Sequence, residues 1–173
     1  MKKICLIAVS AIAVAGASAT VKLPAYIGDN MVLQQNTEIK IPGVTAPGAK
    51  VTVTPSWGKA VKTTADAQGN FTVTLATPAA GGPFSIVFDD GDVLTVDNIL
   101  SGEVWLCSGQ SNMEMPLAGW GQVKDFQTEI AMANNPNVRL LQVHKNISTV
   151  PLDTVEFNGG GWVECTSGTV PGF

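Results

Sequence analysis

A serine in a short polar turn is the strongest chemical signal in this sequence. The apolar run Val104-Trp105-Leu106 leads into the small and polar residues Ser108-Gly109-Gln110-Ser111. Serine hydrolases place their nucleophile at such a strand end, where the hydroxyl stands clear of the sheet. We therefore predict that Ser111 is a nucleophile for acyl transfer and that its own backbone N–H is one donor to the oxyanion.

A serine hydroxyl needs a base before it reacts, and this base is usually a histidine oriented by a carboxylate. The chain has a single histidine, His144. It follows Val138–Val143, a mostly apolar run that we predict to be a buried strand. Because a histidine at a strand end is most often exposed or locally bonded, we do not assign His144 as the base.

Other polar side chains surround the predicted nucleophile. We expect Ser108 to support the backbone of the turn through a local side-chain bond. Gln110 and Asn112 are expected to orient the turn or a substrate, and Glu114 to cap a helix or to remain solvated. For each of these residues the structural role is favoured, so Ser111 alone is predicted to be catalytic.

Two cysteines remain once a leader peptide is removed. Cys107 and Cys165 either form a disulfide or are small buried thiols, and the sequence leaves both alternatives open. Their separation and the lack of histidine partners disfavour a zinc site. We expect no metal and no other cofactor.

Residues 20–98 are predicted to form a small all-β sandwich. Short alternating runs at 37–41, 50–54, 70–75 and 84–88 are separated by proline, glycine and aspartate turns. In the third of these runs Phe71, Val73 and Leu75 fall on one face. Strands at this spacing are typical of a sandwich. Trp57 or Tyr26 could bind carbohydrate there, but packing roles are favoured.

Residues 99–173 are predicted to begin a second domain of the α/β class. We expect a buried strand at 103–107 and then an amphipathic helix, which ends before Pro136 and carries Val123, Phe126, Ile130 and Ala133 on its apolar face. The strand 138–143 would follow. This order predicts a right-handed βαβ unit with Ser111 at the carboxyl end of the first strand.

Residues 1–19 have the three parts of a secretory signal: Lys2-Lys3, an apolar run, and Ala17-Ser18-Ala19 as a cleavage site. We predict cleavage after Ala19, a secreted or periplasmic protein, and no membrane insertion thereafter.

Loss of the two lysines would change the formal charge from −4 to about −6. This acidic balance, with no basic cluster, argues against nucleic acid as a partner.

The chain resembles the sialate O-acetylesterase family of SGNH-type serine esterases. The segment Gly102–Pro116 is similar to the family's serine signature. Further similar segments occur in family order at Asp29–Gln35, Pro47–Val53, Ala80–Phe84, Asn137–Leu140 and Trp162–Cys165. The resemblance implies an SGNH (flavodoxin-like) hydrolase domain and a serine acyl-enzyme that removes acetyl esters from sialic acid or a related sugar, so the expected partner is an acetylated sugar or glycan.

The resemblance also implies an Asp-x-x-His motif well downstream of the serine. His144 does not fit this motif, because Leu141 stands three residues before it. The family continues beyond the position of Phe173, so we interpret the chain as an N-terminal fragment with a truncated hydrolase domain and little activity of its own.

The alternative is a secreted non-catalytic carbohydrate-binding or adhesion module. The sequence leaves open which sugar is bound, whether the chain ends at Phe173, and the oligomeric state.

Overall fold

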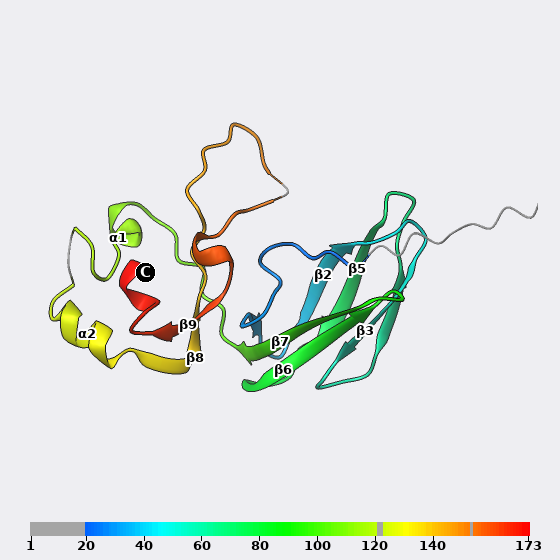
Figure 1. Ribbon diagram of the computed structural model, residues 1–173, viewed down its shortest axis with the longest axis horizontal. Coiled ribbons are helices and arrows are strands. Elements are labelled where there is room, and N and C mark those ends of the chain that lie inside the picture. Colours follow the sequence, from blue (N-terminus) through cyan, green and yellow to red (C-terminus); the bar gives the residue numbers. More distant parts are fainter. Residues whose placement is uncertain (1–19, 121–122, 153) are drawn as a thin grey trace, which may run out of the picture.

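The computed structural model describes residues 20–120, 123–152 and 154–173. The chain forms two lobes, a larger one made of strands and a smaller one with short helices and a strand pair (Figure 1). The predicted leader, residues 1–19, lies outside the described residues. Among the described residues, no helix is long and apolar enough to cross a membrane.

The larger lobe is built from two sheets. A five-stranded sheet has the order β1-β7-β6-β3-β4, and a two-stranded sheet pairs β2 with β5. Neighbouring strands are antiparallel except for β1 and β7, which are parallel. The strands are β1 (Val32–Gln34), β2 (Glu38–Val44), β3 (Lys50–Pro55), β4 (Val61–Thr64), β5 (Asn70–Ala76), β6 (Gly81–Asp89) and β7 (Val93–Gly102).

Alternating side chains give this lobe its core. Along β5 every second residue is buried, and Phe71, Val73 and Leu75 share the buried face as predicted. Together with residues of the larger sheet, such as Ile86 and Phe88, they form a single apolar cluster. The four strands expected from the sequence are all present, each extended by one or more residues. A β-sandwich is therefore the right description of this lobe.

A tight turn between β4 and β5 illustrates how the polar residues support the sandwich. The Asp66 carboxylate accepts hydrogen bonds from the backbone N–H groups of Gln68 and Asn70, both at 2.8 Å. These bonds, that from Asn70 foremost, lower the pKa of Asp66. Gly69 has a φ of +87°, and a Cβ at this position would collide with the carbonyl oxygen of Thr45. The turn therefore requires glycine.

The smaller lobe follows β7 directly. Its elements are α1 (Ser111–Glu114), α2 (Phe126–Met132), β8 (Asn134–Leu140), the 3-10 turn η1 (Asn158–Gly160), β9 (Val163–Thr166) and the 3-10 turn η2 (Val170–Gly172). Strands β8 and β9 pair antiparallel. The chain end packs beside α1, since Leu117 N–H donates to the Phe173 carbonyl at 2.6 Å. No apolar residue of this lobe is fully buried among those described.

The predicted parallel βαβ unit is not formed within the described residues. Residues 103–107 are not a strand but an extended exposed segment, in which Trp105 is 83% and Leu106 94% exposed. The predicted helix starts only at Phe126, and the predicted strand 138–143 overlaps β8 only at residues 138–140, where its partner is antiparallel. The physical reason is that a central parallel strand needs hydrogen-bonded neighbours on both sides and helices over both faces, which the described residues do not supply.

Candidate active site

Ser111 begins the short helix α1 and is exposed to solvent. Its carbonyl accepts a hydrogen bond from Met115 N–H at 3.0 Å, while Gln110 occupies the N-cap position. Neither the hydroxyl nor the backbone N–H of Ser111 is hydrogen-bonded to another described residue. No contact with a described residue therefore occupies either group.

The polar neighbours of Ser111 differ in part from the sequence-based expectations. The side chains of Ser108, Gln110 and Asn112 make no hydrogen bond to any described residue, so the local bond expected of Ser108 is not observed. Glu114 caps no helix but remains exposed, which is the second of the two expected alternatives, and it forms an ion pair with Lys145. Both side chains are at least half exposed, which makes this pair a weak link between α1 and the segment after β8.

His144 is exposed and locally bonded. Its Nδ1 lies 3.1 Å from Oδ1 of Asn158, and its backbone N–H donates to the Glu156 carbonyl at 2.8 Å. Asn158 in turn donates to the side chain of Gln142 at 2.6 Å. The ring partner is thus a neutral amide and not a carboxylate, so among the described residues His144 lacks the acidic orienter of a catalytic base. The run 138–143 was expected to be buried, and this expectation is wrong, since Val143 is exposed.

Two amide side chains of the sandwich hold the chain just before residues 108–111, which we call the serine turn. Gln35 Nε2 and Gln34 Nε2 donate to the two carboxylate oxygens of Glu103 at 2.8 and 3.1 Å. Gln34 Oε1 also accepts a hydrogen bond from Val104 N–H at 3.0 Å. The amide of Gln35, followed by that of Gln34, lowers the pKa of Glu103. We call these four residues the Glu103 clamp.

We expect the Glu103 clamp to make stability depend on pH in acid. Because folding lowers the pKa of Glu103 from its usual 4.5, its carboxylate stabilises the native state above that pH, and this contribution is lost as the pH falls through the lowered value. In urea titrations, Glu103→Gln should therefore differ from the wild type more at about pH 7 than at about pH 3.

The matched control for this prediction is Glu38→Gln. Glu38 lies on β2, and its side chain makes no hydrogen bond to a described residue. Its substitution should leave the difference between neutral and acidic stability unchanged. If Glu103→Gln and the wild type differ by the same free energy of unfolding at both pH values, the clamp does not stabilise the fold.

A buried arginine joins the two lobes. The Arg139 side chain on β8 is only 2% exposed, and its guanidinium donates to the side-chain oxygens of Asn30 and Asn98, each at 3.2 Å. It also lies 3.4 Å from the Glu164 carboxylate on β9. Asn98 donates to both Asn30 and Glu164, at 2.7 and 2.9 Å. We call these four residues the Arg139 cluster.

Sequence reasoning missed the roles of both groups. Every member except Asn98 stands in a segment that carries the family resemblance, which was the available signal, but no periodicity or spacing relates Gln35 to Glu103 or Asn98 to Arg139. These partners lie 68 and 41 positions apart in the chain. Only folding brings them together.

The two remaining cysteines are free thiols in the structure. Cys107 is exposed and Cys165 is half-buried. Of the two alternatives left open by the sequence, the disulfide is not formed, and Cys107 is not buried either. Among the described residues, no three His, Cys, Asp or Glu side chains lie close enough to hold a metal ion.

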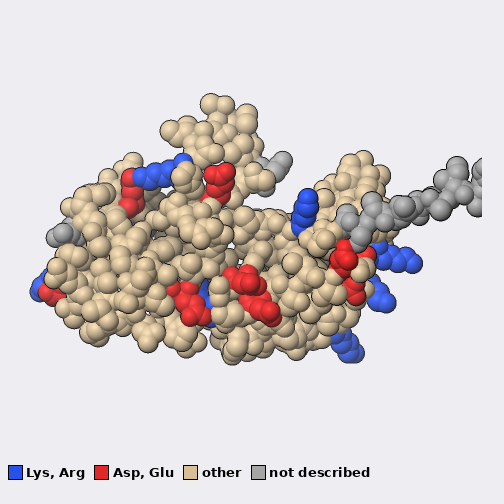
Figure 2. Space-filling view, viewed as in Figure 1, with Lys and Arg blue, Asp and Glu red and all other residues tan. Residues whose placement is uncertain are grey.

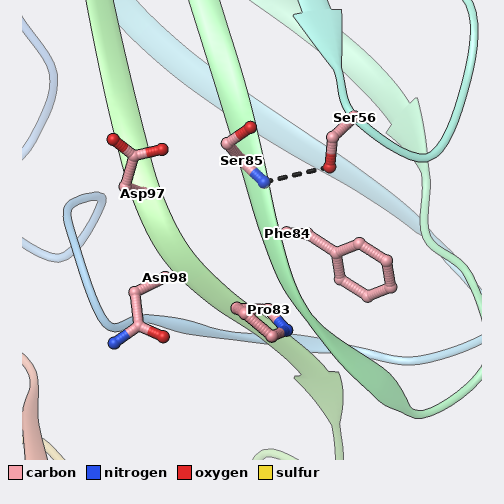
Figure 3. A pocket seen from close by; sticks show the side chains of 6 residues that line it. All are labelled: Ser56, Pro83, Phe84, Ser85, Asp97 and Asn98. Atoms are coloured by element: carbon pink, nitrogen blue, oxygen red, sulfur yellow. Dashed lines mark hydrogen bonds between the residues drawn. The ribbon is translucent and has the colours of Figure 1, made fainter.

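An open pocket of about 310 Å³ lies on the sandwich, lined by residues of β6, β7 and the loop after β3 (Figure 3). Ser85 N–H donates to the Ser56 hydroxyl within it at 3.0 Å. Its lining includes no residue of the segment around Ser111.

Trp57 packs edge-on against Phe84 and donates to the Ala76 carbonyl, so this tryptophan has a packing role as favoured.

Charged side chains are scattered over the surface. On the face drawn in Figure 2, acidic side chains gather near the centre and at the end of the sandwich, and the basic ones form no continuous patch.

The chain is similar to named esterases along most of its length. Sialate O-acetylesterase of Mus musculus is 32% identical over 161 residues, which are 86% of this chain and 29% of that protein. The human sialate O-acetylesterase is 34% identical over 134 residues, 70% of this chain and 25% of that protein. A crystal structure of a carbohydrate acetylesterase from Xanthomonas citri superposes with a TM-score of 0.81 at 35% identity, covering 89% of this chain and 34% of that one.

The sandwich has a similarity of its own. A family described as bacterial Ig domain matches residues 24–95, which agrees with the observed sheets. The chain spans only about a third or less of the length of the esterases that it matches. Since relatives of this one name are 30–34% identical to it over most of its residues, the chain belongs to the sialate O-acetylesterase family.

Proposed function

We propose that this chain is the serine-bearing part of an exported carbohydrate O-acetylesterase. The observation that carries the proposal is the state of Ser111, whose hydroxyl and N–H are exposed and unengaged at the start of α1. The similarity to sialate O-acetylesterases and to a carbohydrate acetylesterase supports an acetylated sugar or glycan as the substrate. Sialic acid is the sugar in the relatives' name, and other acetylated sugars have the same reacting ester.

The reaction follows from the chemistry of an activated serine. The Ser111 hydroxyl attacks the acetyl carbonyl while a base takes its proton, and the tetrahedral oxyanion accepts a hydrogen bond from Ser111 N–H. Collapse breaks the bond to the sugar oxygen, which takes the proton back from the base and leaves as the sugar hydroxyl, so that an acetyl-serine remains. Water then attacks this ester in the same way and releases acetate. The hydrolase domain required for these steps is, in this proposal, of the SGNH type.

The described residues supply only part of this machinery. His144 is bonded to an amide, and no carboxylate orients its ring. A single missing oxyanion donor raises the barrier by about 2.7–4 kcal/mol, and loss of the base costs more. We therefore propose that the base and the further donors come from residues other than those described, in keeping with the longer relatives. The rival binding-module function has less support, because Trp57 is engaged in packing.

Grafting tests this proposal. Residues 20–173 would replace the corresponding segment of the Xanthomonas citri acetylesterase, with which they share 35% identity and a TM-score of 0.81. We expect the graft to release acetate from an acetylated sugar, whereas the ungrafted 173-residue chain should show no rate above its Ser111→Ala variant. A folded graft without activity would overturn the assignment to an esterase. Ser111-dependent turnover by the ungrafted chain would show that it holds its own base.

A further inference from the structure

The junction between the lobes is made of polar groups that fit one another closely. The Glu103 clamp fixes the chain eight residues before Ser111, and it uses both carboxylate oxygens of Glu103 and one backbone N–H. Gln35 adds a backbone bond, from its N–H to the Gly102 carbonyl at 2.9 Å. Two of these four bonds go to the charged carboxylate of Glu103 and are therefore stronger than bonds between neutral groups. The other two hold the backbone of Val104 and Gly102.

The Arg139 cluster makes a second attachment. A guanidinium that is almost completely buried costs free energy unless acceptors surround it, and Asn30, Asn98 and Glu164 provide them. Asn30 and Asn98 both have positive φ, +66° and +55°, which turns their backbones so that carbonyl and side-chain oxygens both lie near Arg139. Non-glycine residues with such backbones are found where the surrounding structure requires them.

The second attachment is connected to the serine turn. Strand β8 ends one residue after Arg139, and the chain continues through Val143 to Lys145, which pairs with Glu114 in α1. Ser111 is the first residue of the same helix. The sandwich is therefore connected to the serine turn by two routes. One is the chain that follows Glu103, and the other is the segment after β8, which contacts α1.

We propose that the β-sandwich positions Ser111 and that Glu103 and Arg139 are the positioning residues. In this role the sandwich is the rigid base on which the serine turn is held, and not a mobile substrate-binding module. The inference concerns the residue that the proposed function names as the nucleophile and thus rests on that function. Three observations carry it: the burial of Arg139, the paired amides on Glu103, and the exposure of the segment between Glu103 and Ser111, which has no core of its own.

Cys107 offers a direct probe of this positioning. It is exposed, lies between Glu103 and Ser111, and can carry a nitroxide label when Cys5 and Cys165 are replaced by alanine. We expect Glu103→Ala to shorten the rotational correlation time of the label by about twofold or more, because the chain around it gains nanosecond motion. Arg139→Gln should shorten it less, because its effect passes through the exposed pair of Lys145 and Glu114.

Glu38→Ala is the matched control, since it removes an exposed glutamate of the sandwich outside both attachments. Circular dichroism of every variant reports whether the sandwich remains folded. The proposal is overturned if Glu103→Ala leaves the label as slow as Glu38→Ala does. If only Arg139→Gln has no effect, the second attachment is refuted and the first stands. Because no substrate is used, these outcomes are separate from those of the grafting experiment.

The graft supplies a readout of catalysis for the same variants. Glu103→Ala should lower kcat by about tenfold with little change in KM, since a misplaced nucleophile hinders the chemical step more than binding. Glu103→Asp, which keeps the charge but shortens the side chain, should recover part of the rate. A loss confined to KM would contradict a positioning role.

Discussion

Ser111→Ala should lower kcat of the grafted esterase by about 10⁴-fold or more, which is the largest effect expected for any substitution in this chain. The reason is that alanine leaves no atom to form the acetyl-enzyme, while the backbone N–H at this position is retained. Residual hydrolysis would come from the oxyanion donors and from substrate binding alone. The measurement is the rate of acetate release from an acetylated sugar at saturating substrate.

Ser108→Ala is the matched control for this experiment. Ser108 lies in the same exposed segment, and its hydroxyl makes no hydrogen bond to a described residue. Its substitution should change kcat by less than about threefold, since it removes no group from the reaction. If both variants lose activity equally, the loss reflects the turn and not the nucleophile. If Ser111→Ala retains full activity, Ser111 is not the nucleophile.

Phe88→Ala should lower the free energy of unfolding of the sandwich by about 3–5 kcal/mol. Phe88 is 0% exposed and lies on β6, where it pairs with Val53 of β3 and Leu94 of β7. Truncation removes the transfer free energy of the ring and leaves a cavity between the two sheets, which neighbouring strands cannot fill because their hydrogen-bond register holds them apart. A urea titration followed by circular dichroism measures the change.

Val93→Ala is the control within the same sheet. Val93 begins β7 and is 66% exposed, so its truncation should change stability by no more than about 0.5 kcal/mol. Equal effects of Phe88→Ala and Val93→Ala would contradict the assignment of Phe88 to the core. So would a change in the denaturant slope without a change in the midpoint, because this indicates an altered denatured state and not a lost contact.

The strands of the sandwich were predictable because their signals are local. The alternation of Phe71, Val73 and Leu75 requires only that one face of a strand be buried, and the opposing sheet satisfies this requirement. Proline and glycine then mark where the strands end. Strand β7 was not predicted: it runs through Asn98 to Gly102, across the position where a domain boundary was expected.

The smaller lobe departed from its sequence pattern for a reason of context. The run at 103–107 is apolar enough for a buried strand, but a strand forms only when neighbours accept its hydrogen bonds. In the described structure, Trp105 and Leu106 lie in solvent instead. Helix α2 forms the middle of the predicted helix, since helical hydrogen bonds are made within the segment itself, but Val123 and Ala133 lie outside it.

By itself, the sequence determined that residues 20–98 would form a sandwich and that a serine would stand in an exposed turn after it. Periodicity and turn residues are sufficient for both, as each depends on neighbours along the chain. The tertiary structure alone decided that Gln34 and Gln35 bind Glu103, that Arg139 is buried against Asn30 and Asn98, and that His144 pairs with an amide. These are contacts between side chains brought together by packing, and no spacing in the sequence encodes them.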